Sequence, residues 1–175
     1  MQEKTIKLTD YIRDIPDFPK EGILFRDITP LLGNRDAFSA AIDAVAEPFV
    51  DADVDYVAAV EARGFIFGSA LAERLGAGFI PIRKPGKLPG AKEAITYDLE
   101  YGSDCLEVHA DAAAAGAKVL MVDDLLATGG TMCAACKLME KLGVEIIGLS
   151  FLVELTDLPG RAKLESYPIH TVIAF

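Results

Sequence analysis

A turn of small residues after an apolar run carries the most informative chemistry in this sequence. The run Val119–Val122 leads into Asp123 and Asp124, and Ala127-Thr128-Gly129-Gly130-Thr131 then opens a stretch with helical periodicity. Unpaired N–H groups at the start of a helix, together with the positive end of its dipole, bind phosphate monoesters. The glycines allow close approach of a ligand, and the threonine hydroxyls add donors. The sequence therefore predicts a phosphate site with two carboxylates beside it.

Other interpretations of this turn are weaker. Two acids after a strand can form an ordinary turn or a helix cap, but an acidic pair followed by Thr-Gly-Gly-Thr is uncommon by chance. The turn also lacks the lysine of a Walker loop and the spacing of the dinucleotide motif Gly-x-Gly-x-x-Gly. An ATPase or a dehydrogenase therefore loses its main support.

The elements that must position this turn alternate between short β-branched runs and longer helical patterns. Such alternation is typical of a parallel sheet flanked by helices, so we expect an α/β fold. Two glycines, Gly76 and Gly143, are placed to end the helices. We expect strands near Tyr56–Glu61, Phe79–Arg83, Val119–Asp123, Glu145–Val153 and Thr171–Phe175, and helices over Phe65–Leu75 and Thr131–Leu142.

Three further segments stand outside this alternation. Asp36–Val50 has helical spacing, whereas Asp17–Leu32 is rich in Pro and Gly and is expected to form a structured loop. The run from Lys84 to Gly90 cannot sustain a helix or a central strand, because Pro lacks a donor and Gly adds backbone entropy. The charged residues between Arg83 and Gly102 are mainly basic up to Asp98, so this segment is expected to form a flexible basic flap.

Size and charge restrict the possible functions. The chain has 175 residues, 51% of them apolar, which suits one domain with one core. Its net charge of −10 would repel nucleic acid, and its apolar runs are far shorter than the ~20 residues of a membrane helix. The first residues do not combine a basic segment with an apolar stretch, so we expect no secretion signal and a cytoplasmic protein without nucleic-acid or membrane partners.

The three cysteines are expected to be free thiols. An odd number of cysteines in such a chain argues against a disulfide framework. Cys133 and Cys136 form a Cys-x-x-Cys pair, but no second pair exists, and neither His109 nor His170 has metal-ligand spacing to it. We therefore interpret both as small buried residues of one helix.

The segment Val122–Thr131 resembles the signature of the type I phosphoribosyltransferase family for 5-phosphoribosyl 1-pyrophosphate (PRPP). This resemblance implies that Asp123 and Asp124 contact the ribose hydroxyls and the hydration shell of Mg²⁺. No protein side chain is expected to bind Mg²⁺ directly. The 5′-phosphate would be held by Ala127, Thr128, Gly129, Gly130 and Thr131.

Glu61-Ala62-Arg63-Gly64 lies between a predicted strand and a predicted helix and resembles the pyrophosphate loop of the same family. The resemblance implies that Glu61, Ala62 and Arg63, with Lys84 from the flap, bind pyrophosphate. Taken alone, Arg63 could also be an ordinary surface arginine near a helix start.

Two segments resemble the adenine-specific branch of the family. Tyr97-Asp98-Leu99-Glu100-Tyr101-Gly102 is similar to its catalytic segment and implies Glu100 as general acid/base; the alternative is an exposed hairpin with a chance acid. Phe18–Ile28 is similar to its base-binding hood. There Phe25 would stack on the purine, and backbone groups of Leu24 and Arg26 would bind the edge of adenine. Phe25 could instead be an ordinary core residue.

The resemblance covers nearly the whole chain and implies one domain, with the hood at about residues 1–34 and the core at about 35–175. The expected reaction joins adenine to PRPP and gives AMP and pyrophosphate, with Mg²⁺ as cofactor, in purine salvage. A homodimer is also expected. The closest alternative is a 6-oxopurine enzyme, but that branch has an aspartate where this chain has Ala127. The other alternative is a PRPP-sensing regulator that binds nucleic acid, which the net charge disfavours.

Overall fold

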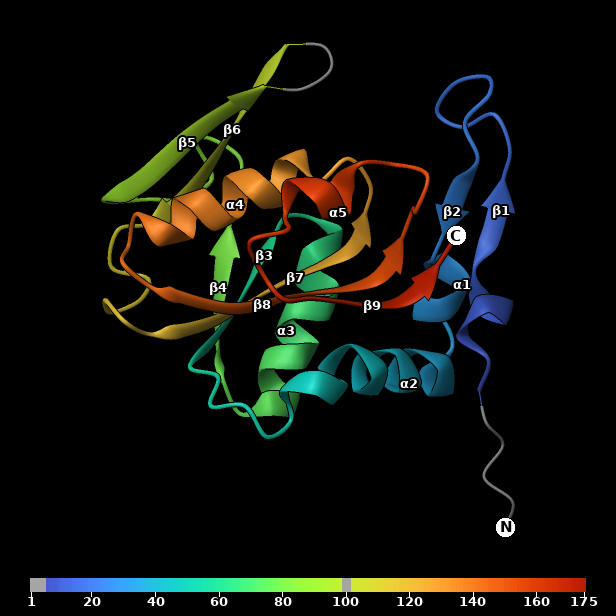
Figure 1. Ribbon diagram of the computed structural model, residues 1–175, viewed down its shortest axis with the longest axis horizontal. Coiled ribbons are helices and arrows are strands. Elements are labelled where there is room, and N and C mark those ends of the chain that lie inside the picture. Colours follow the sequence, from blue (N-terminus) through green and yellow to red (C-terminus); the bar gives the residue numbers. More distant parts are fainter. Residues whose placement is uncertain (1–5, 99–101) are drawn as a thin grey trace. The chain divides into compact units, whose positions relative to one another are not determined.

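The computed structural model describes residues 6–98 and 102–175, and it divides into two compact units, Met1–Ala44 and Val45–Phe175 (Figure 1). The general acid/base expected at Glu100 lies outside the described residues. The expectation of one domain stays a prediction. Among the described residues, none of the helices is long and apolar enough to cross a membrane.

The first unit consists of short elements. The 3₁₀ turn η1 (Leu8–Tyr11) leads into β1 (Arg13–Ile15), which pairs antiparallel with β2 (Phe25–Asp27). The helical turn α1 (Thr29–Leu32) and the helix α2 (Arg35–Ala46) follow, and the last two residues of α2 belong to the second unit. The expected loop at 17–32 thus contains a strand and a helical turn, both too short to produce a readable period.

Asp27 joins these short elements. Its Oδ1 accepts hydrogen bonds from the backbone N–H of Thr29 (2.9 Å) and the Thr29 hydroxyl (2.6 Å), while its Oδ2 accepts one from Arg13 Nη2 (2.6 Å). The hydrogen bonds from Thr29 and Arg13 lower the pKa of Asp27 to about 2. Asp27 therefore ties strand β1 to the start of α1 through an ionised carboxylate.

The second unit is built on a five-stranded parallel sheet with the order β4-β3-β7-β8-β9, which confirms the predicted fold class. All five predicted strands are present, with ends shifted by one or more residues. The largest difference between a predicted and an observed strand is at β7, which continues to Leu126 and pairs there with β8. The strands are β3 (Tyr56–Val60), β4 (Gly78–Ile82), β7 (Lys118–Leu126), β8 (Glu145–Glu154) and β9 (Ile169–Ala174).

The two long helices of this unit cover opposite faces of the sheet. From β3 the chain crosses through α3 (Arg63–Leu75) to β4, and from β7 it crosses in the other direction through α4 (Gly130–Glu140) to β8. Right-handed crossovers in opposite directions place their helices on opposite faces. Two shorter pieces, η2 (Glu47–Phe49) and α5 (Gly160–Lys163), complete the unit.

Alternate residues of each strand supply the two cores. On one face Val60, Met121 and Phe151 are buried in one cluster with Met132 and Leu138 of α4. On the other face α3 lies so close to β3 that a Cβ at Gly68 would be 2.7 Å from Ala59 Cβ. This packing places the starts of α3 and α4 at the carboxyl ends of β3 and β7.

The expected flap, 83–102, contains strand β5 (Lys92–Asp98), which pairs antiparallel with β6 (Ser103–His109) in a hairpin beside α4 (Figure 1). The basic residues Arg83, Lys84 and Lys87 precede this hairpin. Neither strand was expected from the sequence. Glu107 is buried and anchors the base of the hairpin. Its backbone pairs with that of Arg83. Its carboxylate accepts a hydrogen bond from the backbone N–H of Gly86 (3.1 Å) and forms an ion pair with Lys92 Nζ (3.3 Å).

Asp27→Asn should destabilise the protein by about 1–2 kcal/mol at pH 7, because it weakens the hydrogen bonds from Thr29 and the pair with Arg13. Since the folded-state pKa is depressed, the stabilisation is complete above about 3.8 and disappears as the pH falls through about 2. Urea unfolding followed by circular dichroism measures the difference between wild type and variant at each pH.

The exposed pair of Lys7 and Asp10 in the same unit provides the control. Asp10→Asn should change the free energy of unfolding by less than about 1 kcal/mol, because exposed ion pairs contribute little. Equal effects of the two substitutions would contradict the role given to Asp27.

Candidate active site

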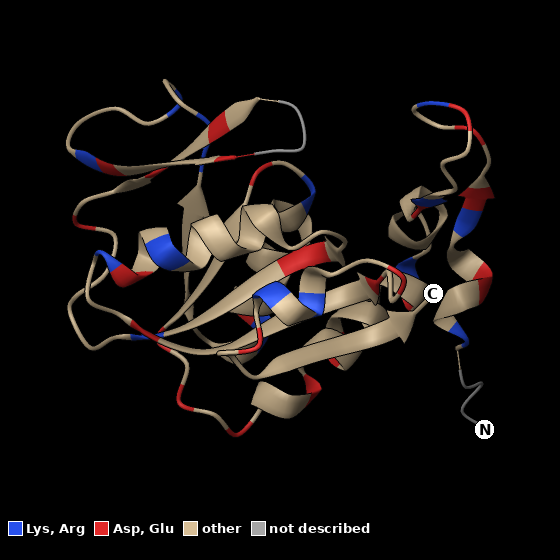
Figure 2. Ribbon diagram, turned by 45° about the horizontal axis from the view of Figure 1, so that its top comes forward, with Lys and Arg blue, Asp and Glu red and all other residues tan. Residues whose placement is uncertain are grey.

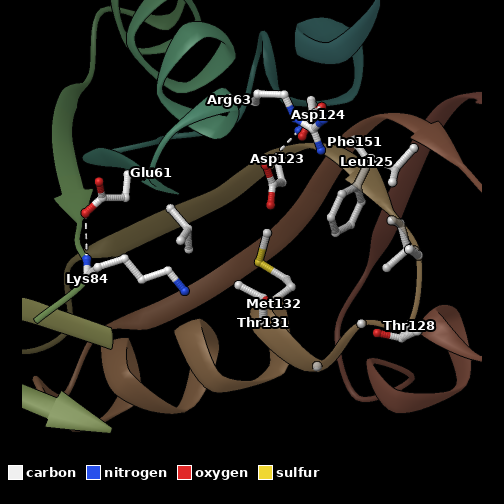
Figure 3. Close-up of a pocket in the computed structure, with 15 residues that line it drawn as sticks. Glu61, Arg63, Lys84, Asp123, Asp124, Leu125, Thr128, Thr131, Met132 and Phe151 are labelled. Atoms are coloured by element: carbon white, nitrogen blue, oxygen red, sulfur yellow. Dashed lines mark hydrogen bonds and ion pairs between the residues drawn. The ribbon is translucent and has the colours of Figure 1, made fainter. Parts of the chain in front are cut away.

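A cavity of about 270 Å³ opens at the carboxyl ends of β3 and β7, next to the start of α4 (Figure 3). Open α/β sheets bind ligands at this edge. Nearly all predicted residues of the second unit line it: Glu61, Arg63, Lys84, Asp123, Asp124, Ala127, Thr128, Gly129, Gly130 and Thr131. Ala62 is exposed and does not line it.

The phosphate turn, residues 127–131, has the geometry that an anion requires. Gly129 is the N-cap of α4 and has a φ of 74°, a left-handed conformation that glycine adopts without strain. The first turn of α4 carries no acidic residue, and Figure 2 shows its charged positions only toward the carboxyl end. The positive end of the helix dipole is therefore not neutralised by the helix's own side chains.

A second glycine, Gly160 at the start of α5, packs directly against this turn. A Cβ at Gly160 would overlap the carbonyl oxygen of Ala127, and a Cβ at Gly129 would be 2.7 Å from the carbonyl oxygen of Gly160. Real Cβ atoms do not approach other atoms this closely, so both positions exclude side chains. The phosphate turn is thus held open by contact between two backbones.

The two acids lie within β7, not after it, and both line the cavity. Figure 3 shows Asp123 extending into the cavity and Asp124 turned toward Arg63. Arg63 Nε is 2.9 Å from Asp124 Oδ2, so the arginine and the buried acid neutralise each other. Burial and the neighbouring Asp124 carboxylate raise the pKa of Asp123 well above its ordinary value. Gly64 allows this close packing, since a Cβ there would be 2.9 Å from Asp123 Oδ1.

Glu61 holds the far side of the cavity. Its Oε1 accepts hydrogen bonds from the backbone N–H of Lys84 (2.6 Å) and from Arg83 Nε (3.2 Å). The Lys84 hydrogen bond, supported by Arg83, lowers the pKa of Glu61 despite burial. The peptide bond that follows, Glu61–Ala62, is cis. Glu61 therefore fixes where the flap leaves β4.

The predicted base-binding residues all lie in the first unit. Phe25 is half-buried, and its ring meets that of Phe18 edge to face at 5.1 Å. Phe18 and Leu24 remain about half exposed, at 51% and 45%. The side chain of Arg26 pairs with Asp14 Oδ1 at 2.5 Å. This unit thus presents an apolar, aromatic surface.

Several contributors had not been expected. The apolar wall of the cavity comes from neighbouring residues of the sheet and α4, and Gly160 supports the turn from a distant segment. The Leu-Pro-Gly sequence at 158–160 indicates a turn, but not where it packs. The additional lining residues are Val60, Leu125, Leu126, Met132 and Phe151.

Gly160→Ala should weaken the binding of ribose 5-phosphate about tenfold or more, because the added methyl group must displace the Ala127 carbonyl and distort the turn. Isothermal titration calorimetry measures this affinity, and thermal melting shows whether the variant is folded. Gly33→Ala is the matched control, since its added Cβ makes only ordinary contacts, the nearest at 3.4 Å. A folded Gly160→Ala variant with unchanged affinity would refute the bracing role.

Comparison with other proteins gives a consistent result. The phosphoribosyl transferase domain family matches residues 32–173. An adenine phosphoribosyltransferase of Pseudothermotoga lettingae is 60% identical over 96% of this chain and 99% of its own length, and one of Rhodopirellula baltica is 56% identical over 96% and 82%.

Solved structures agree with these relatives. The crystal structure of adenine phosphoribosyltransferase from Thermoanaerobacter pseudethanolicus has a TM-score of 0.93 and 52% identity, covering 96% of this chain and 98% of its own. The Saccharomyces cerevisiae enzyme, complexed with an imino-altritol bisphosphate and adenine, has a TM-score of 0.89 and 44% identity, covering 94% and 96%. With this similarity over nearly its full length, the chain belongs to the phosphoribosyltransferase family and, within it, to the adenine phosphoribosyltransferases.

Proposed function

We propose that this protein transfers the 5-phosphoribosyl group of PRPP to adenine and releases AMP and pyrophosphate, a reaction of purine salvage. One observation carries this proposal beyond family membership. A single cavity combines an open phosphate turn, two carboxylates and the cations Arg63 and Lys84. These are the groups that a phosphorylated sugar with an anionic leaving group requires.

The leaving group is the first task of the site. Arg63 and Lys84 neutralise the charge that develops on pyrophosphate as the C1′–O bond weakens. Arg63 is paired with Asp124 in the structure, so it exchanges this partner for the ligand. Asp123 and Asp124 hold the ribose hydroxyls, and the phosphate turn holds the 5′-phosphate. Fixing both ends of the sugar positions C1′ for attack.

Mg²⁺ is proposed as the cofactor, and the residues present fit an ion that is held through its water ligands and the substrate phosphates. Within residues 6–98 and 102–175 no group of three or more His, Cys, Asp or Glu residues could hold a metal ion alone. Mg²⁺ commonly binds through one or two carboxylates together with waters and substrate phosphates. Asp123 and Asp124 would hold its hydration shell, and the bound ion would neutralise pyrophosphate charge.

Adenine requires a stacking surface and a group that takes its proton. Phe25 and the backbone of Leu24 and Arg26 are proposed to bind the base, which is supported by the apolar side chains exposed near them. Glu100, from the resemblance, takes the N9 proton as the C1′–N9 bond forms. The flap excludes water, which would otherwise hydrolyse PRPP.

Adenine is favoured over 6-oxopurines because position 127, where the related branch carries an aspartate, is an alanine that lines the cavity. The homodimer, the cytoplasmic location and the action of the two units as one domain also remain proposals. Size-exclusion chromatography with light scattering measures the first of these.

Purified protein with PRPP, Mg²⁺ and adenine should form AMP, detected by chromatography. Hypoxanthine, guanine and xanthine, offered separately, should give little product. Preferred turnover of a 6-oxopurine would contradict the assigned base, and absence of product with every base would contradict the proposed function.

Glu100→Gln should reduce turnover by ~10²–10⁴-fold, which is the usual contribution of a positioned acid/base group. The affinity for PRPP should stay close to that of the wild type, because the proton transfer concerns adenine. Steady-state kinetics measure turnover, and titration calorimetry measures PRPP affinity. A fully active Gln variant would show that another group takes the proton.

A further inference from the structure

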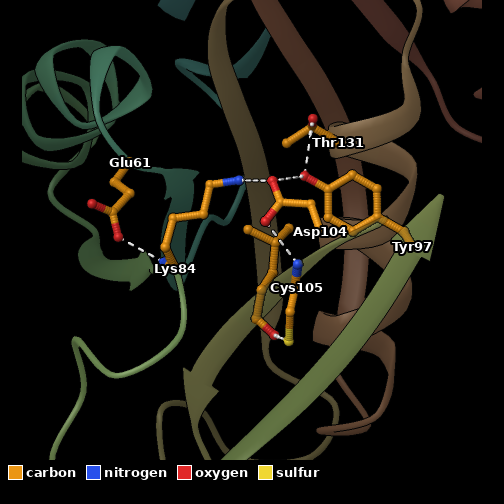
Figure 4. A network of polar contacts seen from close by, with 7 residues as sticks. Glu61, Lys84, Tyr97, Asp104, Cys105 and Thr131 are labelled. Atoms are coloured by element: carbon orange, nitrogen blue, oxygen red, sulfur yellow. Dashed lines mark hydrogen bonds and ion pairs between the residues drawn. The ribbon is translucent and has the colours of Figure 1, made fainter. Parts of the chain in front are cut away.

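A polar network links the flap hairpin to both ends of the cavity (Figure 4). Asp104 of β6 is its centre. One oxygen of its carboxylate accepts hydrogen bonds from Lys84 Nζ and from the Tyr97 hydroxyl (3.2 Å), and the other accepts one from the backbone N–H of Cys105 (2.8 Å). The Tyr97 hydroxyl is also 3.3 Å from Thr131 Oγ1, in the phosphate turn.

We propose that Asp104 is a positioning residue that holds the Lys84 ammonium in place to bind pyrophosphate, and that Tyr97 connects this pair to the phosphate turn. The inference rests on the proposed function and extends it, because it gives roles to Asp104 and Tyr97, neither of which received one from the sequence.

The placement of the three side chains favours positioning over competition. Lys84 lines the cavity, whereas Asp104 and Tyr97 do not. The carboxylate therefore contacts the ammonium from outside the set of residues that line the cavity. An ammonium has three N–H donors, so it can bind Asp104 and still donate to pyrophosphate.

Lys84 is also held at its backbone. Its N–H donates to Glu61 Oε1 at 2.6 Å, so the main chain and the end of the side chain are both fixed. A lysine side chain loses considerable rotamer entropy when a ligand immobilises it. Holding the ammonium beforehand removes part of that loss from the binding step.

The charges of the pair support this geometry. Burial lowers the pKa of Lys84, but the hydrogen bond to Asp104 and the nearby Tyr97 outweigh it, so the pKa lies above its ordinary value. The hydrogen bond from Lys84 lowers the pKa of Asp104 despite burial. Both groups are therefore fully charged near neutral pH.

Pyrophosphate and ribose 5-phosphate each correspond to one part of PRPP, and we call them the two half-ligands. Their binding tests the proposal without turnover. In the full-length protein with Mg²⁺, Asp104→Asn should weaken pyrophosphate binding about tenfold and leave ribose 5-phosphate binding within about twofold. Asp104→Glu, which restores the carboxylate, should recover most of the loss. Tyr97→Phe should cause a smaller loss of pyrophosphate affinity, because Lys84 keeps its partner. Titration calorimetry measures the affinities of the wild type and of each variant for both ligands.

Asp111→Asn is the matched control, because it removes the same charge from an exposed position just after β6. It should leave both affinities unchanged. Tighter pyrophosphate binding by Asp104→Asn would overturn the proposal, since the carboxylate would then compete with the ligand. Equal losses for both half-ligands would also overturn it, because they would indicate general damage to the site.

The kinetics distinguish this inference from the proposed function. Asp104→Asn should raise the KM for PRPP about tenfold while kcat and the KM for adenine change little. If the wild type forms no AMP, the proposed function fails, whereas the half-ligand titrations still decide the role of Asp104.

Discussion

The site depends on a steric constraint, the contact between the backbones at Gly129 and Gly160. A side chain at either position would overlap the other segment, so the phosphate turn keeps its shape only while both residues are glycine. The sheet makes this contact possible, because β7 and β8 are neighbours and the segments that follow them contain Gly129 and Gly160. The turn therefore keeps the geometry in which the first N–H groups of α4 can bind an anion.

A second feature of the site is that its cations form ion pairs with neighbouring acids. Arg63 pairs with Asp124, Lys84 with Asp104, and Arg83 with Glu61, so each cation around the cavity has an acidic partner in the structure. A chain of net charge −10 can still bind a polyanion, because Arg63 and Lys84 line the cavity itself. The cations are kept close to the ligand site by local acids, and overall charge has little influence at such short range.

The parts visible in the sequence are those with local signals. The five parallel strands follow from their β-branched runs, and the turn follows from its acids and glycines next to a helical pattern. Gly160 could not be recognised, because its role arises from a contact with residues about thirty positions earlier. Strands β5 and β6 were missed because Pro and Gly precede them and half of β5 faces solvent. The pairing partners of Lys84 and Arg63 depend on tertiary structure alone.

The anchoring of the hairpin at Glu107 has an evolutionary consequence. Glu107 contacts Arg83, Gly86 and Lys92 at the base of the hairpin, and these residues provide the hydrogen bonds and the ion pair of its buried carboxylate and backbone. The exposed positions of β5 beyond Lys92, which are Ala94, Thr96 and Asp98, can therefore be exchanged without disturbing these attachments. Over evolution this side of the hairpin can diverge while the base of the flap and the machinery for the activated sugar are inherited intact.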